Sequence, residues 1–216
     1  MSAGVRYKFQ GSTVQVSIGA ASPKTITDIE VDTEGVPVVT SAAHGMSLGT
    51  AGTIAAVVGM TELNGNAYVV DNPLTGSFEL AGVDASGYTP YVSGGTFTPF
   101  TYSEFCELTG VDQQDGTADE IDATTICSTA KEFEVGLSDS GTLTLNYNFA
   151  PKSNVQAGFR AAKLSGDQVA VRIVLPNGGG TVVMLGSVQQ SSFSGANSAL
   201  WTGTTTLKLT GEIFVL

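Results

Sequence analysis

The stretch from Thr142 to Phe149 alternates strictly between apolar and polar side chains. The apolar members share one face: Leu143, Leu145, Tyr147 and Phe149. The polar members share the other: Thr142, Thr144, Asn146 and Asn148. A two-residue period is that of a β-strand with one buried face and one hydrated face. The stretch therefore predicts a sheet whose hydrated face carries neutral polar groups, without a histidine, a cysteine or a paired acid and base.

The rest of the chain favours an all-β protein with one α-helix. Short runs of β-forming residues lie between Gly, Asn, Asp and Pro, and glycine alone occurs 27 times. Residues 128–149 predict a strand, a turn and a second strand. Only 153–163 has a helical pattern, with Ser153 as a candidate N-cap and Val155, Phe159 and Ala162 on one face.

The charge of the chain argues against a conventional nucleic-acid-binding protein. The formal net charge is −11, and an acidic surface repels phosphate. Residues 101–130 contain seven acids and no base. Within them, "VDQQDGTADEID" lacks the oxygen ligands of a calcium-binding EF-hand loop at its third and fifth positions. This acidic segment is either a solvated loop or a surface whose negative charge is functional. Its candidate residues are Asp112, Asp115, Asp119, Glu120 and Asp122.

No motif predicts catalysis, a metal site or a cofactor. His44 is the sole histidine and is expected to be a turn residue. Cys106 and Cys127 are expected to be buried reduced thiols, with a disulfide or a reactive pair as alternatives, and the absence of a CxxC motif argues against zinc. The sequence shows neither a secretory signal nor an apolar run of membrane-spanning length, so we expect a cytosol-like compartment and no membrane partner.

The sequence pattern differs between Ile26 and about Thr96 from that of the rest of the chain. Strands there are shorter, turns are denser and almost all charge is acidic, and Asn64-Gly65 is a strong hairpin signal. We therefore expect two units. Residues 1–21 and 98–216 form one discontinuous β domain with the helix. Residues 22–97, which we call the insert, form a small β module placed in one of its loops.

The segment "DGTADEIDATTICSTAKEFEVGLSDSGTLTLNYNF" resembles the tail tube proteins of long-tailed, non-contractile bacteriophages. The likeness rests on "EID", on "STAKEFEVGL" and on the turn "DSGTLTL", followed by the helix, a long hairpin and the terminal "TGTTTLKLTGEI". It implies a tail-tube β-sandwich or barrel that is structural, not enzymatic. The insert is similar to a small β-barrel module akin to the β-barrel half-domain of ubiquitin-activating enzymes, without the enzymatic implication.

This resemblance implies hexameric rings that stack into a hollow tube in the virion tail, assembled in the host cytoplasm. Its partners would be copies of itself, a tape-measure protein, tail tip and tail terminator proteins, and DNA in transit. Thr142, Thr144, Asn146 and Asn148, or their counterparts on a neighbouring strand, would face the channel, and the acidic segment would face the channel or a ring interface. Alternatives are a head–tail connector, a decoration protein, or a carbohydrate-binding β-sandwich that uses Tyr88, Tyr91 and Trp201.

Overall fold

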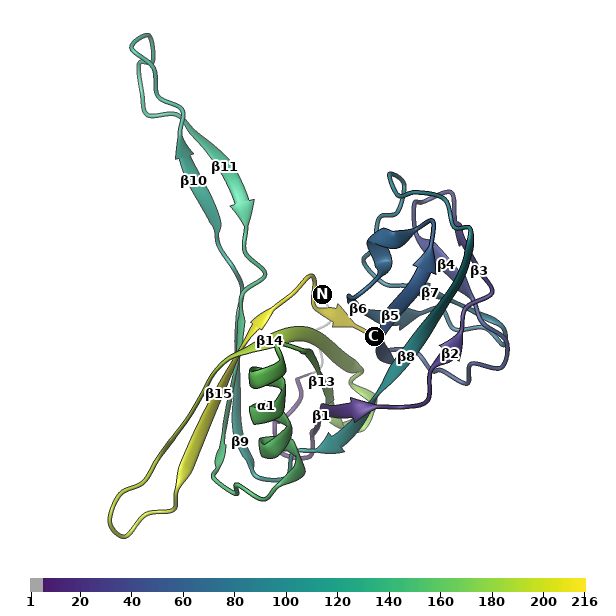
Figure 1. Cartoon of the computed structure of the whole chain (residues 1–216). Helices are drawn as coiled ribbons and strands as arrows, with labels where there is room; N and C mark the ends of the chain where they lie inside the picture. Colours follow the sequence, from purple (N-terminus) through teal and green to yellow (C-terminus); the bar gives the residue numbers. More distant parts are fainter. Residues whose placement is uncertain (1–5) are drawn as a thin grey trace.

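The computed structural model describes residues 6–216, and within that range the chain is built of β-strands with one α-helix (Figure 1). This fold class was predicted and is confirmed. The strands are β1 Thr13–Ala20, β2 Lys24–Thr25, β3 Asp28–Val31, β4 Pro37–Thr40, β5 Ala51–Val58, β6 Ala67–Asp71, β7 Ser77–Leu80, β8 Ser93–Glu104, β9 Leu108–Gln114, β10 Ala118–Asp122, β11 Phe133–Ser138, β12 Thr142–Asn148, β13 Gln168–Val174, β14 Thr181–Ser194, β15 Thr202–Leu209 and β16 Phe214–Val215. The helix α1 spans Asn154–Ser165, and short 3-10 helices span Thr61–Leu63 and Pro176–Gly178.

Fourteen strands join in one sheet, in the order β3-β4-β7-β6-β5-β8-β1-β13-β14-β15-β12-β9, with β16 beside β14 and β2 beside β8. Its pairs are antiparallel. The resemblance led us to expect a sandwich or barrel, but the sheet is open and β9 is the last strand at one edge. The reason is that the next strand, β10, leaves the sheet and pairs only with β11.

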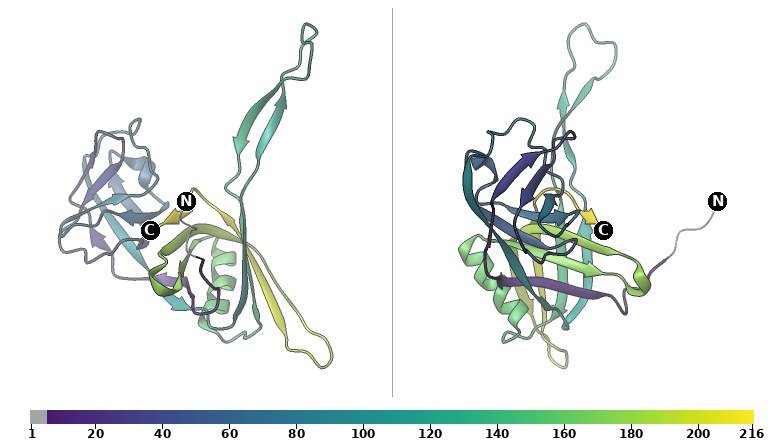
Figure 2. Two further views of the ribbon diagram at one scale, coloured as in Figure 1. Left: turned by 180° about the vertical axis from the view of Figure 1, so that it is seen from behind. Right: turned by 90° about the vertical axis from the view of Figure 1, so that its right-hand side faces the viewer.

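The sheet curls around a core that α1 covers (Figures 1 and 2). Val155 and Phe159 of α1 are each 1% exposed, and the Phe159 ring meets the Phe105 ring edge-on at 5.8 Å. The helix lies where its pattern predicted, and it ends at Gly166, which has a φ of 79°. Ser153 occupies the N-cap position, as predicted, but its hydroxyl makes no capping hydrogen bond and donates to the Glu107 carboxylate at 3.4 Å instead.

The insert encloses a second core, which includes Phe78 and Phe97 with their rings 5.1 Å apart. The chain segment 24–31 begins beside β8 and ends beside β4. The Ile26 N–H donates to the Gly95 carbonyl at 3.0 Å, and the next amide, of Thr27, donates to the Thr40 carbonyl at 2.9 Å. The hydrogen-bonded path thus passes from β8 to β4 around this core.

His44 connects two loops of the insert. Its side chain is 3% exposed. Its Nδ1 accepts the Met46 N–H at 3.1 Å and its Nε2 lies 2.8 Å from the Leu74 carbonyl, so the ring is the neutral tautomer that donates from Nε2. The sole histidine is therefore a buried structural group, where the sequence suggested a simple turn residue.

A third apolar cluster joins the insert to the main sheet. Ala51 and Val69 of the insert contact Ala170, Val183 and Leu185 of β13 and β14. β8 also passes through both parts, since residues 93–99 pair within the insert and residues 100–104 pair with β1. The predicted boundary at 97/98 lies inside this strand, and the division into two units stays a prediction. Of the predicted segment 1–21, residues 1–5 lie outside the described residues.

The end of the chain strengthens this junction. Leu216 exchanges two backbone hydrogen bonds with Thr181, at 2.8 and 2.9 Å, and Phe214 packs with the third cluster. We expect Phe214→Ala to lower the free energy of unfolding by about 2 kcal/mol, because a large, half-buried ring is lost. Val215→Ala, at a side chain 73% exposed, is the matched control and should change it by under about 0.5 kcal/mol. Urea denaturation measures both, and equal effects would contradict the packing role of Phe214.

Candidate functional site

The hydrated side of β12 is part of a larger polar surface that spans four strands. By register, Thr144 of β12 lies between Asp112 of β9 and Thr206 of β15, and Thr206 lies beside Gln190 of β14. Directly paired residues share a face of the sheet. The members of this polar face are Asp112 and Gln114 on β9, Thr142, Thr144, Asn146 and Asn148 on β12, Thr202, Thr204, Thr206 and Lys208 on β15, and Gln190, Ser192 and Ser194 on β14.

All members of the polar face are exposed or half-exposed. Hydroxyl and amide groups bridge neighbouring strands. The Thr204 hydroxyl donates to Asn146 Oδ1 at 2.9 Å, and the hydroxyls of Ser194 and Thr202 lie 3.1 Å apart. The surface therefore consists mainly of neutral groups that hydrogen-bond to one another across strands while remaining in contact with water.

The opposite side of β12 is buried, as its alternation predicted. Leu143 and Leu145 are 0% exposed and Tyr147 is 3% exposed. The Tyr147 hydroxyl lies 2.9 Å from the Thr205 hydroxyl, which satisfies a polar group within this core. Phe149 is half-buried and stacks on Phe193. Because this side packs toward α1, the polar face points away from the helix.

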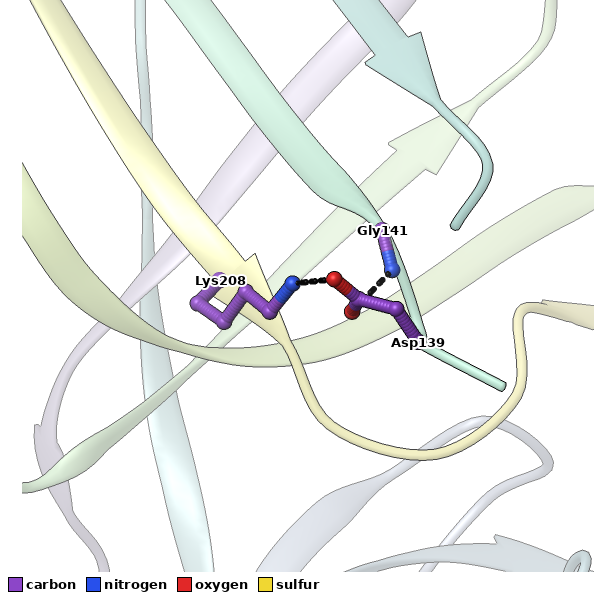
Figure 3. A network of polar contacts seen from close by, with 3 residues as sticks. All are labelled: Asp139, Gly141 and Lys208. Carbon is purple, nitrogen blue, oxygen red and sulfur yellow. Dashed lines mark hydrogen bonds and ion pairs between the residues drawn. The ribbon is translucent and has the colours of Figure 1, made fainter. Parts of the chain in front are cut away.

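The polar face contains one cation, Lys208, and it is paired. Its ammonium group contacts the Asp139 carboxylate, which also accepts the Gly141 N–H at 3.0 Å (Figure 3). The hydrogen bond from Lys208, followed by that from Gly141, lowers the pKa of Asp139 below its ordinary value. The other charged member of the face, Asp112, is negative. At neutral pH the polar face therefore presents no unpaired positive charge.

The lowered pKa of Asp139 gives a prediction with a definite sign. The ion pair contributes stability above the unfolded-state pKa of the carboxyl group, and this contribution is lost as the pH falls through the lower folded-state pKa. We expect carboxyl ¹³C NMR to place the Asp139 titration below the ordinary aspartate range. In Lys208→Met, the midpoint should move upward. An unchanged midpoint in this variant would show that Lys208 is not the cause.

The structure separates the acidic residues that the sequence grouped. Asp112 lies on the polar face, and Asp115 lies just beyond β9, where its Oδ1 accepts a hydrogen bond from Gln113 at 2.7 Å. Asp119, Glu120 and Asp122 belong to β10, away from the main sheet. These five residues do not form one surface, and which of them face a channel or an interface stays a prediction.

The β10–β11 hairpin projects from the molecule, and we call residues 116–140 the arm (Figure 1). The predicted order of strand, turn and strand over 128–149 holds, but β11 pairs with β10 and not with β12. Its alternate residues Phe133, Val135 and Leu137 are 52%, 80% and 89% exposed. An exposed apolar row of this kind is typical of interaction surfaces.

A second projection lies at the outer end of the β14–β15 hairpin. Phe149 and Phe193 stack with ring centres 4.7 Å apart, and Trp201 lies 6.0 Å from Phe193. Phe193, Leu200 and Trp201 are 62%, 74% and 56% exposed. Tyr88 and Tyr91, in contrast, pack against the insert core. The three aromatic residues that a carbohydrate site would need therefore do not form one surface.

The two cysteines are free, as expected, but the prediction that they are buried is wrong. Both are exposed, Cys106 between β8 and β9 and Cys127 between β10 and β11. Each lies in a connection between two strands. Among the described residues, no group of three or more His, Cys, Asp or Glu side chains could hold a metal ion. Within the same part of the chain, no helix is long and apolar enough to cross a membrane.

A crevice of about 560 Å³ lies between α1, β1 and the insert. Small residues such as Gly158, Ala162 and Ser165 form part of its wall, and Asp167 is the titratable residue among those that line it. An acid–base mechanism needs a second group within reach of the same proton path. The crevice offers space without paired catalytic groups.

Comparison with known proteins connects this architecture to phage tails. A family model described as phage tail tube, TTP, lambda-like matches residues 91–182, which is less than half of the chain. The match spans β8, β9, the arm, β12, α1 and β13, and it supports a structural, non-enzymatic tail-tube role. No curated protein matches the chain.

Among solved structures, the chain is similar to a protein in the tail of an empty GTA particle, a structure computed with helical refinement and C6 symmetry. The identity is 13% and the TM-score is 0.42, over 53% of this chain and 86% of that one. We draw no conclusion from a likeness of this size. The resemblance of the insert to a half-domain of ubiquitin-activating enzymes stays a prediction.

Proposed function

We propose that the protein forms the wall of a phage tail tube, in which sixfold rings stack around a channel that DNA crosses. The observation that carries this proposal is the polar face, a surface four strands wide without an unpaired cation, three of whose strands begin within the stretch that matches the tail tube family. Particle assembly in the host cytoplasm and residence in the virion tail belong to the same proposal.

The polar face suits the lining of a DNA conduit. Lysine or arginine on such a wall would neutralise phosphates and release counterions, which would hold the duplex in place. Neutral hydroxyls and amides stay hydrated and offer no such contact, and Asp112 repels phosphate over about a Debye length, ~8 Å at physiological salt. We therefore place Thr142, Thr144, Asn146 and Asn148 toward the channel.

The position of the insert supports the same orientation. β9 and β15 lie on one side of α1 and the insert lies on the other (Figure 1), in agreement with the view from behind (Figure 2). Since the polar face points away from α1, a ring that turns this face inward carries the insert on its outside. The channel then stays open, and the insert lies on the outer surface of the tail.

Ring closure can use the free edge of the sheet. An unpaired edge strand such as β9 is a hazard in a solitary protein but offers a ready contact for a neighbouring copy. A head-to-tail contact that closes gives a ring. In the assembled tail a tape-measure protein would occupy the channel before DNA, and tail tip and terminator proteins would bind the two ends of the tube.

Electron microscopy of purified protein tests this function. We expect sixfold rings or stacked tubes once protein concentration is raised or a tail tip is supplied as a nucleus. A chain that stays solitary under all these conditions would contradict the proposal. A single layer of rings that never stacks would favour a head–tail connector or a decoration protein.

A further inference from the structure

The arm combines an exposed apolar row with a strong negative charge. Residues 118–138 contain five acids, namely Asp119, Glu120, Asp122, Glu132 and Glu134, and one base, Lys131. By register, Glu120 lies opposite Val135 and Asp122 lies opposite Phe133, so acids and apolar residues share one face. A partner for this face must offer apolar area and positive charge together.

One surface of the same chain has both properties. Residues 140–166 contain no acid and carry three bases, Lys152, Arg160 and Lys163, all exposed. The Arg160 guanidinium donates to the Pro151 carbonyl at 2.5 Å, and the nearby Phe149 N–H donates to the Trp201 carbonyl at 2.8 Å. These bonds tie Arg160 and the loop that contains Lys152 to the aromatic end of the β14–β15 hairpin, and Lys163 lies further along the same helix. We call Lys152, Arg160, Lys163, Phe193, Leu200 and Trp201 the basic aromatic surface.

The arm and the outer end of the β14–β15 hairpin project from opposite ends of the molecule, in Figure 1 and in both views of Figure 2. The two surfaces of one copy therefore do not meet each other. Two different patches at opposite ends make a heterologous contact, which repeats from copy to copy along one direction.

We propose that the arm of one copy docks on the basic aromatic surface of a second copy of this chain. Phe133, Val135 and Leu137 cover the exposed aromatic residues, while the arm acids lie against the three bases. The inference rests on the proposed function, since it supplies the contact between successive rings. Charge complementarity selects this partner and its direction, because an arm facing another arm would bring together the five acids of residues 118–138 from each copy.

Cross-linking between two variants tests the contact. In a Cys106→Ser, Cys127→Ser background, one preparation carries Leu137→Cys on the arm and a ¹⁵N-labelled one carries Leu200→Cys. A bis-maleimide reagent should join them with a yield about tenfold above that of Leu137→Cys mixed with Val58→Cys, an insert residue 53% exposed. Equal yields, or a predominance of arm-to-arm products, would overturn the proposal.

A charge swap tests specificity. Lys152→Glu with Lys163→Glu should lower the yield about tenfold at low salt, and Glu120→Lys with Asp122→Lys, on the apolar face of the arm, should restore it. Lys8→Glu with Lys24→Glu gives the same net charge elsewhere and should leave the yield unchanged. A failed rescue, an equal loss in this control, or loss of cross-linking on adding duplex DNA would show another occupant.

The outcome for the contact is separable from that for the function. Stacked sixfold tubes without the arm-to-surface product would overturn the docking and leave the tail-tube role intact. The cross-linked product in particles that are neither rings nor tubes would support the docking and contradict the tail-tube role.

Discussion

Phe159→Ala is expected to lower the free energy of unfolding by about 3–5 kcal/mol, the range for loss of a buried aromatic side chain. Phe159 is 1% exposed and connects α1 to the core inside the curled sheet, where it meets Phe105. Its removal leaves a cavity between the helix and the strands that carry the polar face. Tube assembly should fail together with stability.

Urea denaturation followed by circular dichroism measures the effect. Leu164→Ala is the matched control, because Leu164 belongs to the same helix but is 90% exposed. We expect it to change the free energy of unfolding by less than about 0.5 kcal/mol. A loss below about 1 kcal/mol for Phe159→Ala would mean that α1 does not hold the sheet in its curved form.

Thr144→Lys combined with Thr204→Lys is expected to leave assembly intact and to slow DNA ejection strongly. The two positions lie on adjacent strands of the polar face, and neither is in the core. Each lysine that meets a phosphate adds a contact whose affinity falls with salt, with a slope of about −0.9 per contact. Copies repeated around and along the tube multiply this effect.

Dye-monitored release of DNA from intact particles measures the delay. We expect the delay to shrink as salt rises, while ejection through the unmodified tube stays insensitive to salt. Thr33→Lys with Thr75→Lys adds the same charge on exposed positions of the insert and is the control. Unchanged ejection through tubes of the first variant would place its two residues away from the channel.

Local patterns in the sequence predicted two parts of this structure well. The alternation at Leu143, Leu145 and Tyr147 identified the buried side of β12 because a strand has only two faces. The spacing of Val155 and Phe159 identified the buried side of α1, and Gly166 marked its end. In both cases one short segment contained the whole signal.

Strand pairing was harder to predict because alternation shows the two faces of a strand but not which strand lies beside it. β11 precedes a turn into β12, but it pairs with β10. At the base of the arm its two backbone segments pass so close at Gly116 and Gly141 that neither position has space for a side chain. The residues of β11 do not show whether it pairs with β10 or with β12, the strands before and after it in the sequence. The exposure of Cys127 was missed for the same reason, because this residue lies in the arm.

The candidate site could be predicted only in part for the same reason. The sequence identified the four polar residues of β12, but the register supplied those of β14 and β15, which lie more than forty positions further along the chain. The third cluster, which joins Ala51 to Leu185, is a contact of this long-range kind. Its residues carry no local pattern that distinguishes them from ordinary core.

A cryo-electron microscopy map of assembled particles, at a resolution that separates strands, tests the central claim most directly. Our account predicts sixfold rings with β9, β12, β15 and the outer half of β14 around the bore, the hydroxyls of Thr144 and Thr204 turned inward, and the insert outside. A bore lined by α1 or by the insert, or one bordered by unpaired lysine and arginine, would contradict it.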